Sequence, residues 1–397
     1  MDRIPIISTP KFAVWLILFL SILVYSHTLV CQFVYDDLVI TVMENPALLG
    51  TANVWEILTW DRPLREFTYM ADHALWGFHP FGYHLQNIIW HAANGVLLYF
   101  LLMYLGVKKE GSLAIALLFA VHPINTEAVA WVSGRKELLC LFFELTACFL
   151  FVSALNKEKI HIPNYFLSIL ALILALLSKQ VAVATPFLCL ACWVFFLAKK
   201  GRAIHIKKAL LGVAPLFIIT IFFIFFRYDV IHRLDVIHSK GTFYDPSARD
   251  VSFTFLSAIL TPFATFAKSI WLFIYPIDLT IERGFEPVTT LFDIRWVIGF
   301  LLIIGLLYLA ISTFKRVPAI ALGLFWLMIT WAPISGFAPV AYLLADRYLY
   351  IPCIGFCIAG ISWAAYLLAR YPQRYKIGLL ALICLFFTVR TVDRTFD

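Results

Sequence analysis

Charged residues are scarce in this chain. Of its 397 residues, 14% are charged and 62% are hydrophobic, whereas about a quarter of the residues in a soluble domain are charged. This scarcity excludes a soluble globular protein, and the long apolar runs indicate an integral membrane protein that crosses the bilayer many times. The net charge of +7 therefore has to be divided between the two sides of the membrane before it is informative.

Accessible thiols, a cleavage site and internal repeats are also missing. Most of the eight cysteines lie in apolar runs. Cys189 and Cys192 have C-x-x-C spacing but no polar neighbours, which disfavours redox or metal chemistry because both need an accessible thiolate. Lys11 precedes an apolar run without a small-residue cleavage site, so the first span is predicted to be an uncleaved anchor. No period typical of tetratricopeptide or other repeats is present.

The apolar runs predict one all-α polytopic membrane domain over residues 1–397 with about 11 spans. The spans are expected at 12–31, 84–105, 112–130, 137–155, 163–178, 181–198, 208–226, 294–314, 318–336, 349–369 and 376–391. Residues 253–275 are similarly apolar, but Pro262 interrupts them. We expect a broken, re-entrant hairpin there, because irregular backbone is tolerated at membrane depth when protein surrounds it.

Basic residues predict the orientation of the spans. Every second boundary is basic, and together with the N-terminus these boundaries hold 16 basic and three acidic residues, against 15 and 21 elsewhere. The positive-inside rule then places the N-terminus in the cytosol and the C-terminus outward, in the lumen or periplasm. The larger outward loops are 32–83, in which aromatic residues among charges predict interfacial helices, and 227–293, which contains the re-entrant segment.

Polar side chains gather at the outward ends of these spans. The candidates are Asp36, Asp37, Arg62, Arg65, His79, His84, His122, Glu127, Arg135, Lys136, Lys179, Asp346 and Arg347, accompanied by Asp278 and Glu282. Ionised groups at membrane depth are costly and usually functional. A carboxylate of the Asp36–Asp37 pair can act as a general base, while cations can bind a phosphate leaving group. This combination suits sugar transfer from a lipid-linked phosphate.

Structural roles are the alternatives for each candidate. Asp36 and Asp37 are compatible with helix capping, Arg347 with a local pair to its neighbour, and Lys179 with snorkelling to the interface.

Arg135 and Lys136 are compatible with plain loop charges, although outward basic pairs run against the orientation bias. The three candidate histidines are compatible with interfacial packing, and metal binding by them is disfavoured.

Several motifs together resemble the transmembrane and tetratricopeptide-repeat O-mannosyltransferases and their bacterial relatives, which have the GT-C fold. They are FVYDD at 33–37, NP at 45–46, RPL at 62–64, HPFGYHLQN at 79–87, HPINTEAV at 122–129, GR at 134–135, YPIDL at 275–279 and ADRYLYIP at 345–352. The resemblance covers nearly the whole chain. Two positions depart from the family pattern: Asn125 replaces an expected histidine, and Gln180 follows Lys179 in place of an expected acid.

The resemblance implies a glycosyltransferase that inverts the sugar. Its donor would be a dolichyl-type polyprenyl-phosphate sugar, with mannose in eukaryotic members, and its acceptor a protein Ser or Thr hydroxyl on the outer face. Asp36 and Asp37 correspond to the family's acidic pair, and they could instead hold Mg²⁺ or Mn²⁺. Because family members usually continue into repeats, we expect either a longer parent protein or a separate repeat protein that binds the acceptor. A flippase of lipid-linked sugars and a non-catalytic scaffold of a glycosylation complex remain alternatives.

Overall fold

The computed structural model describes residues 9–38, 42–156, 159–203, 206–235, 255–281, 283–337 and 342–396. These residues form fifteen α-helices joined by short 3₁₀ turns, with no β-strand in the described ranges. The helices are α1 (Pro10–Tyr25), α2 (Val54–Thr59), α3 (Pro63–Trp76), α4 (Pro80–Leu105), α5 (Lys109–Val121), α6 (Thr126–Ala130), α7 (Arg135–Leu155), α8 (Ile162–Ser178), α9 (Thr185–Lys199), α10 (Ile206–Asp235), α11 (Phe255–Ile274), α12 (Ile294–Thr313), α13 (Pro318–Trp331), α14 (Tyr350–Leu367) and α15 (Gln373–Arg394).

The prediction of an all-α polytopic membrane protein is confirmed. Nine helical segments in the described ranges are long and apolar enough to cross a bilayer, and α5 and α6 form a further pair bent by 52°. Helices α8 and α13 are apolar but shorter. Each of the eleven predicted spans therefore coincides with a helix or with this bent pair.

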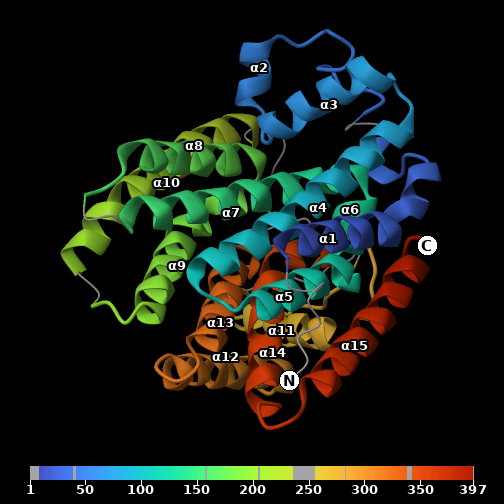
Figure 1. Ribbon diagram of the computed structural model, residues 1–397. Helices are drawn as coiled ribbons and strands as arrows, with labels where there is room; N and C mark the ends of the chain where they lie inside the picture. Colours follow the sequence, from blue (N-terminus) through green and yellow to red (C-terminus); the bar gives the residue numbers. More distant parts are fainter. Residues whose placement is uncertain are drawn as a thin grey trace.

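Helix α7 forms the centre of the bundle. Along most of its length its side chains are buried, including those of charged residues in its first turn. Helix α8 packs along one side of it and α4 and α9 along others (Figure 1). Because α7 is enclosed by protein, the charges at its beginning are held away from lipid.

Two short helices occupy the first predicted outward loop. Helices α2 and α3 lie at one edge of the molecule (Figure 1), where α3 packs on α4 and α8. Helix α3 has a buried face that includes Glu66, Tyr69 and Asp72, whereas Trp55 on α2 is 80% exposed. The predicted helices are therefore present, and their position in the membrane interface stays a prediction.

The segment predicted as a broken hairpin begins with an unbroken helix. Helix α11 continues through Pro262, and the Thr265 hydroxyl donates a hydrogen bond to the Pro262 carbonyl (2.9 Å). The expectation of a break at Pro262 was therefore wrong.

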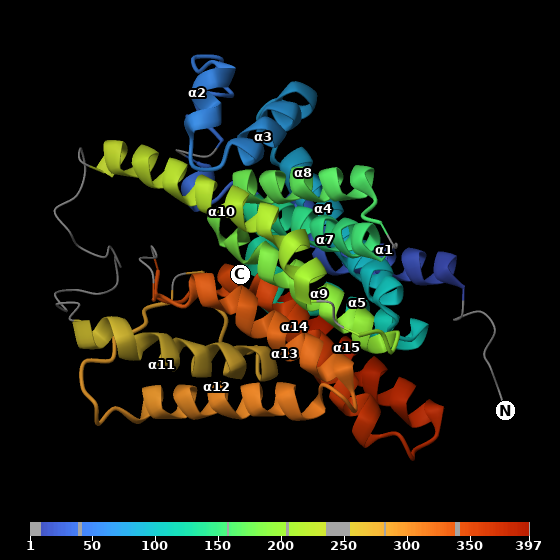
Figure 2. The same cartoon turned by 90° about the vertical axis from the view of Figure 1, so that its left-hand side faces the viewer.

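The chain after α11 returns to the end at which that helix begins, and the predicted re-entrant position of this segment in the membrane stays a prediction. Gly299, near the start of α12, packs against the backbone of Phe263, in the first half of α11. These two helices lie side by side (Figure 2). The Val288 amide donates to the Thr261 hydroxyl (3.0 Å), so the chain after α11 has returned beside its first half. Helices α11 and α12 therefore start at the same end of the bundle. Within the predicted loop 227–293, residues 236–254 and Glu282 lie outside the described residues.

Helices α13 and α14 approach closely through two glycines. A Cβ atom on Gly355 would lie 2.3 Å from the Leu327 nitrogen and 2.6 Å from the Gly323 carbonyl oxygen. Small residues allow such backbone contact between membrane helices. This pair carries the start of α14, where two candidate site residues, Asp346 and Arg347, immediately precede the helix.

Gly355→Ala is expected to destabilise the protein by about 1–3 kcal/mol, because the added methyl group forces α13 and α14 apart. Thermal unfolding of the purified protein in detergent measures the change. Gly360→Ala, on the same helix, is the matched control, since a Cβ there meets no atom within 4 Å. Equal melting temperatures for the two variants would show that the close approach is not required.

Candidate active site

A buried ion pair fastens α3 to the start of α7. Arg135 Nη1 lies 2.5 Å from Asp72 Oδ2, and both side chains are fully buried. The guanidinium also donates to Asn87 Oδ1 (2.9 Å) and to the Tyr83 carbonyl (2.8 Å), and it lies over the Tyr69 ring. Burial raises the pKa of the Asp72 carboxyl, and the Arg135 charge opposes this. Arg135, predicted to bind substrate, is thus enclosed by protein partners.

The two adjacent aspartates lie in different environments. Both are in the 3₁₀ turn η3 (Tyr35–Asp37), where Asp36 is exposed and Asp37 is fully buried. Asp37 Oδ1 accepts hydrogen bonds from the Ser133 amide (3.1 Å) and hydroxyl (2.7 Å). Burial raises the pKa of Asp37 to about 6, while the Ser133 hydrogen bonds and the Lys136 charge act to lower it.

Lys136 is a buried cation without a carboxylate partner. Its side chain is 5% exposed, and its ammonium lies 4.8 Å from the centre of the Trp131 ring. Among the described residues, no Asp or Glu oxygen lies within 4.0 Å of it. The charges of Arg62, Arg65 and Arg347 are close enough to repel it. A buried charge is costly unless it is paired, so this site favours an anion.

Two neighbouring cations are paired with buried glutamates. Arg347 pairs with Glu127 through its guanidinium, and its backbone amide donates to the same carboxylate (2.7 Å). Lys179 pairs with Glu137. Aromatic faces cover these cations as well: the Arg347 guanidinium lies 5.3 Å from the centre of the Trp131 ring, and the Lys179 ammonium lies 4.6 Å from that of Tyr348.

Helix α3 brings two further arginines towards this cluster. Arg62, just before the helix, pairs with Asp61 at 3.2 Å, and both are partly exposed. Arg65 is mostly buried and pairs with Glu66 at 2.5 Å. We call Arg62, Arg65, Lys136, Lys179 and Arg347 the cation cluster. The structure therefore gathers five of the predicted residues from α3, α7, the turn after α8 and the turn before α14.

Asp346 belongs to a structural network beside the cluster. It accepts a hydrogen bond from the Thr280 amide (2.7 Å) and pairs with Arg283 at 3.1 Å. This network attaches the chain that follows α11 to the turn η8 (Asp346–Leu349), which carries Arg347. Arg283 was not predicted as a site residue, and its position in a loop of sequence 275–293 gave no signal of this contact.

The three candidate histidines differ in their exposure and in their hydrogen-bond partners. His79 is exposed at the start of α4, and His84 is buried one turn further along that helix. His122 is buried with both ring nitrogens engaged, one with the Phe273 carbonyl (3.1 Å) and one with the Ile124 amide (3.2 Å). His122 therefore packs between α5 and α11, and its predicted role in substrate binding stays a prediction.

The predicted divalent ion fits the acidic pair poorly. Asp37 Oδ1 accepts from Ser133 and its Oδ2 is buried without a described hydrogen-bond partner, whereas Asp36 is exposed, so the two carboxylates do not face one ion together. Within the described ranges, no three His, Cys, Asp or Glu side chains are grouped as metal ligands. We therefore derive no chemical step through a metal ion.

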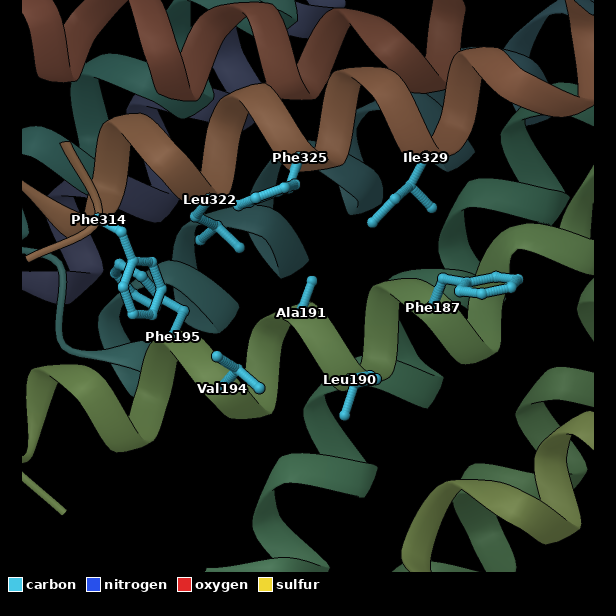
Figure 3. A pocket seen from close by; sticks show the side chains of 9 residues that line it. All are labelled: Phe187, Leu190, Ala191, Val194, Phe195, Phe314, Leu322, Phe325 and Ile329. Carbon is cyan, nitrogen blue, oxygen red and sulfur yellow. The ribbon is translucent and has the colours of Figure 1, made fainter. Parts of the chain in front are cut away.

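An apolar groove lies between α9 and α13. It encloses about 230 Å³, and Figure 3 shows its lining side chains. They are Phe187, Leu190, Ala191, Val194, Phe195, Phe314, Leu322, Phe325 and Ile329. None carries a charge, so the groove contributes no group to the polar chemistry.

Sequence reasoning missed Asp72, Trp131 and Ser133. The sequence pattern places Asp72 in a predicted interfacial helix and Trp131 in a short connection between spans, and Ser133 carries no charge, so none of the three is marked as a site residue. The signal for Ser133 is its place directly before Gly134, whose added Cβ would lie 2.3 Å from the Ala128 carbonyl oxygen. Such a tight turn implies a fixed backbone beside the two basic residues that follow.

Fold and site together define a polytopic, multi-pass membrane protein with a cation cluster and an acidic turn at one end of its bundle. Comparison with known proteins gives relatives along almost the whole chain, although no family profile matches it. A protein O-mannosyl-transferase of Mus musculus, TMTC3, is 25% identical over 94% of this chain and 44% of its own length. The protein O-mannosyl-transferase TMTC1 of Homo sapiens is 27% identical over 94% of this chain and 48% of its own length. The protein O-mannosyl-transferase F38B6.6 of Caenorhabditis elegans is 27% identical over 85% of this chain and 49% of its own length.

The chain is therefore similar along almost its whole length to protein O-mannosyl-transferases, the family that its motifs resemble. It spans about half of the length of these curated relatives.

Proposed function

We propose that this chain is a membrane glycosyltransferase that moves mannose or a similar hexose from a polyprenyl-phosphate carrier to a Ser or Thr hydroxyl of a protein. The observation that carries the proposal is Lys136, a buried ammonium without a described carboxylate partner, among other cations and near Asp37. Relatives named protein O-mannosyl-transferases support the same reaction class.

In the proposed reaction, a carboxylate of the Asp36–Asp37 pair accepts the proton of the acceptor hydroxyl. The hydroxyl oxygen then forms a bond to the anomeric carbon of the sugar from the face opposite the phosphate. The bond between that carbon and the phosphate oxygen breaks with inversion. The departing polyprenyl phosphate carries the electron pair away, and Lys136 and Arg347 stabilise its charge.

The membrane side and the partners are also proposals. The charge distribution supports an active site on the lumenal or periplasmic face, with the N-terminus in the cytosol and the C-terminus outward. The partners are then the lipid-linked donor, membrane lipid and a protein acceptor. Acceptor capture involves repeats, either in a longer parent protein or in a separate protein.

The test is the Asp36→Asn/Asp37→Asn double variant of the full chain, purified in detergent. Release of polyprenyl phosphate from labelled polyprenyl-phosphate mannose, with a Ser- and Thr-containing peptide as acceptor, should fall by about 10²–10⁴-fold, the usual contribution of a general base. A chelator is expected to leave the wild-type rate unchanged.

Undiminished transfer by the double variant would overturn the proposal. The same assay separates the rival functions: a flippase has no activity in detergent that consumes the donor, and a scaffold leaves it intact. Asp393→Asn serves as a control, because the described partner of the Asp393 side chain is Arg390, in an exposed pair on α15.

A further inference from the structure

Ser133 holds the turn that carries the two aspartates in place. Ser133 lies in η5 (Val132–Gly134), directly before α7. Both its amide and its hydroxyl donate to Asp37 Oδ1. The carbonyl of the preceding Val132 accepts from the Tyr69 hydroxyl (2.9 Å). This turn therefore joins the acidic loop, α3 and the beginning of α7.

The backbone of the acidic turn is strained. Tyr35 has a φ of 51°, in the left-handed region that residues other than glycine rarely adopt. Such conformations persist only where surrounding contacts determine them. The Asp37 amide donates to the Val34 carbonyl (3.0 Å), and its side chain accepts the two hydrogen bonds from Ser133. The anchoring of Asp37 is what opposes relaxation at Tyr35.

The strained turn separates the two carboxylates. Asp37 is fully buried, so an acceptor hydroxyl cannot reach it without movement of the loop, whereas Asp36 is exposed. A general base must come within hydrogen-bonding distance of the proton that it removes. Access thus favours Asp36 as the group that meets the acceptor.

We propose that Asp37 and Ser133 are positioning residues, which hold Asp36 as the accessible base at a fixed place beside η5, the turn that leads into α7 and Lys136. This inference rests on the proposed function and divides the roles within the acidic pair. Lys136 follows Ser133 by three residues, so one turn sets the position of both the base and the cation. Misplacement of a reacting group by about 1 Å can lower a rate 100-fold.

The test compares Asp36→Asn, Asp37→Asn, Ser133→Ala and Ser133→Thr in the full chain. Asp36→Asn should abolish transfer. Asp37→Asn keeps an oxygen that accepts from Ser133, and burial already disfavours the charged form of the Asp37 carboxyl, so this variant should fold. Its kcat should fall by about tenfold. Ser133→Ala should lose a similar factor, and Ser133→Thr should restore most of the rate because it keeps the hydroxyl.

The donor KM separates positioning from general damage. Because the cation cluster binds the phosphate, KM for polyprenyl-phosphate mannose and the stoichiometry of polyprenyl phosphate binding should be unchanged in Ser133→Ala. Ser168→Ala is the matched control: Ser168 is also fully buried, but its hydroxyl donates only to the Ala147 carbonyl on a neighbouring helix. It should leave kcat unchanged.

Each other outcome has a definite meaning. If Asp37→Asn is as inactive as Asp36→Asn, or if Ser133→Ala behaves like Ser168→Ala, the division of roles is wrong and the proposed function stands. If Asp36→Asn and Asp37→Asn both transfer at the wild-type rate, the proposed function itself fails.

Discussion

Lys136→Met should stabilise the protein and nearly abolish its use of the donor. The ammonium is 5% exposed and lies against the Trp131 face among repelling cations, while the Asp37 and Glu137 carboxylates attract it from beyond ion-pairing distance. Replacing such a buried charge by an apolar side chain of similar length removes a desolvation penalty, so the melting temperature in detergent should rise. Loss of a buried charge that meets a phosphate costs about 2–5 kcal/mol. We expect kcat/KM for polyprenyl-phosphate mannose to fall by about 30-fold or more.

Lys179→Met is the matched comparison for stability. It is the same substitution in another buried lysine of the cation cluster, but Lys179 forms an ion pair with Glu137. Removing one partner of a buried pair leaves the other charge uncompensated and costs about 3–5 kcal/mol. The two variants should therefore shift the melting temperature in opposite directions. Equal destabilisation, with an unchanged donor KM for Lys136→Met, would contradict an anion site at Lys136.

Asp72→Asn should destabilise the fold as strongly as any single substitution considered. It leaves the fully buried Arg135 without its carboxylate partner, again at a cost of about 3–5 kcal/mol. This corresponds to a decrease in melting temperature on the order of 10 °C. Since the pair joins α3 to α7, limited proteolysis should also cleave the segment that contains α2 and α3 faster than in the wild type.

Two further variants check the cause of that loss. Asp393→Asn removes the carboxylate of an exposed pair, which is worth about 0–1 kcal/mol, and should change the melting temperature little. Asp72→Leu combined with Arg135→Leu removes both charges and should recover part of the stability lost in Asp72→Asn. If the double variant is no more stable than Asp72→Asn, the uncompensated charge is not the cause.

The role of Arg135 shows how sequence and structure differ in what they report. Its position beside Lys136 made the two residues equal candidates for phosphate binding. In the structure, Arg135 is enclosed by Asp72, Asn87 and the Tyr83 carbonyl, whereas Lys136 has no described carboxylate partner. Adjacent residues at the start of a helix point to different sides of it, and no motif states which side faces protein and which faces an open site.

For the segment from α11 to the start of α12, composition also predicted one property and missed another. Composition predicted an apolar element that enters and leaves at one end, and the contacts of Thr261 and Gly299 agree with this. Composition could not predict that Pro262 would lie inside a continuous helix, because a proline is tolerated in a membrane helix only where neighbouring helices and side chains of the folded protein support the backbone.

The amino-acid sequence predicts a multi-pass helical membrane protein, the places of its helices and the family that it resembles. Those properties depend on the length of apolar runs and on the order of motifs, both of which are local. Which charges are paired and which are not depends on the folded arrangement of the helices. Asp72 and Arg135 are 63 positions apart, and Glu127 and Arg347 are 220 apart. Pairing at such separations depends on how the helices pack, and packing alone left Lys136 without a described carboxylate partner and Asp36 exposed.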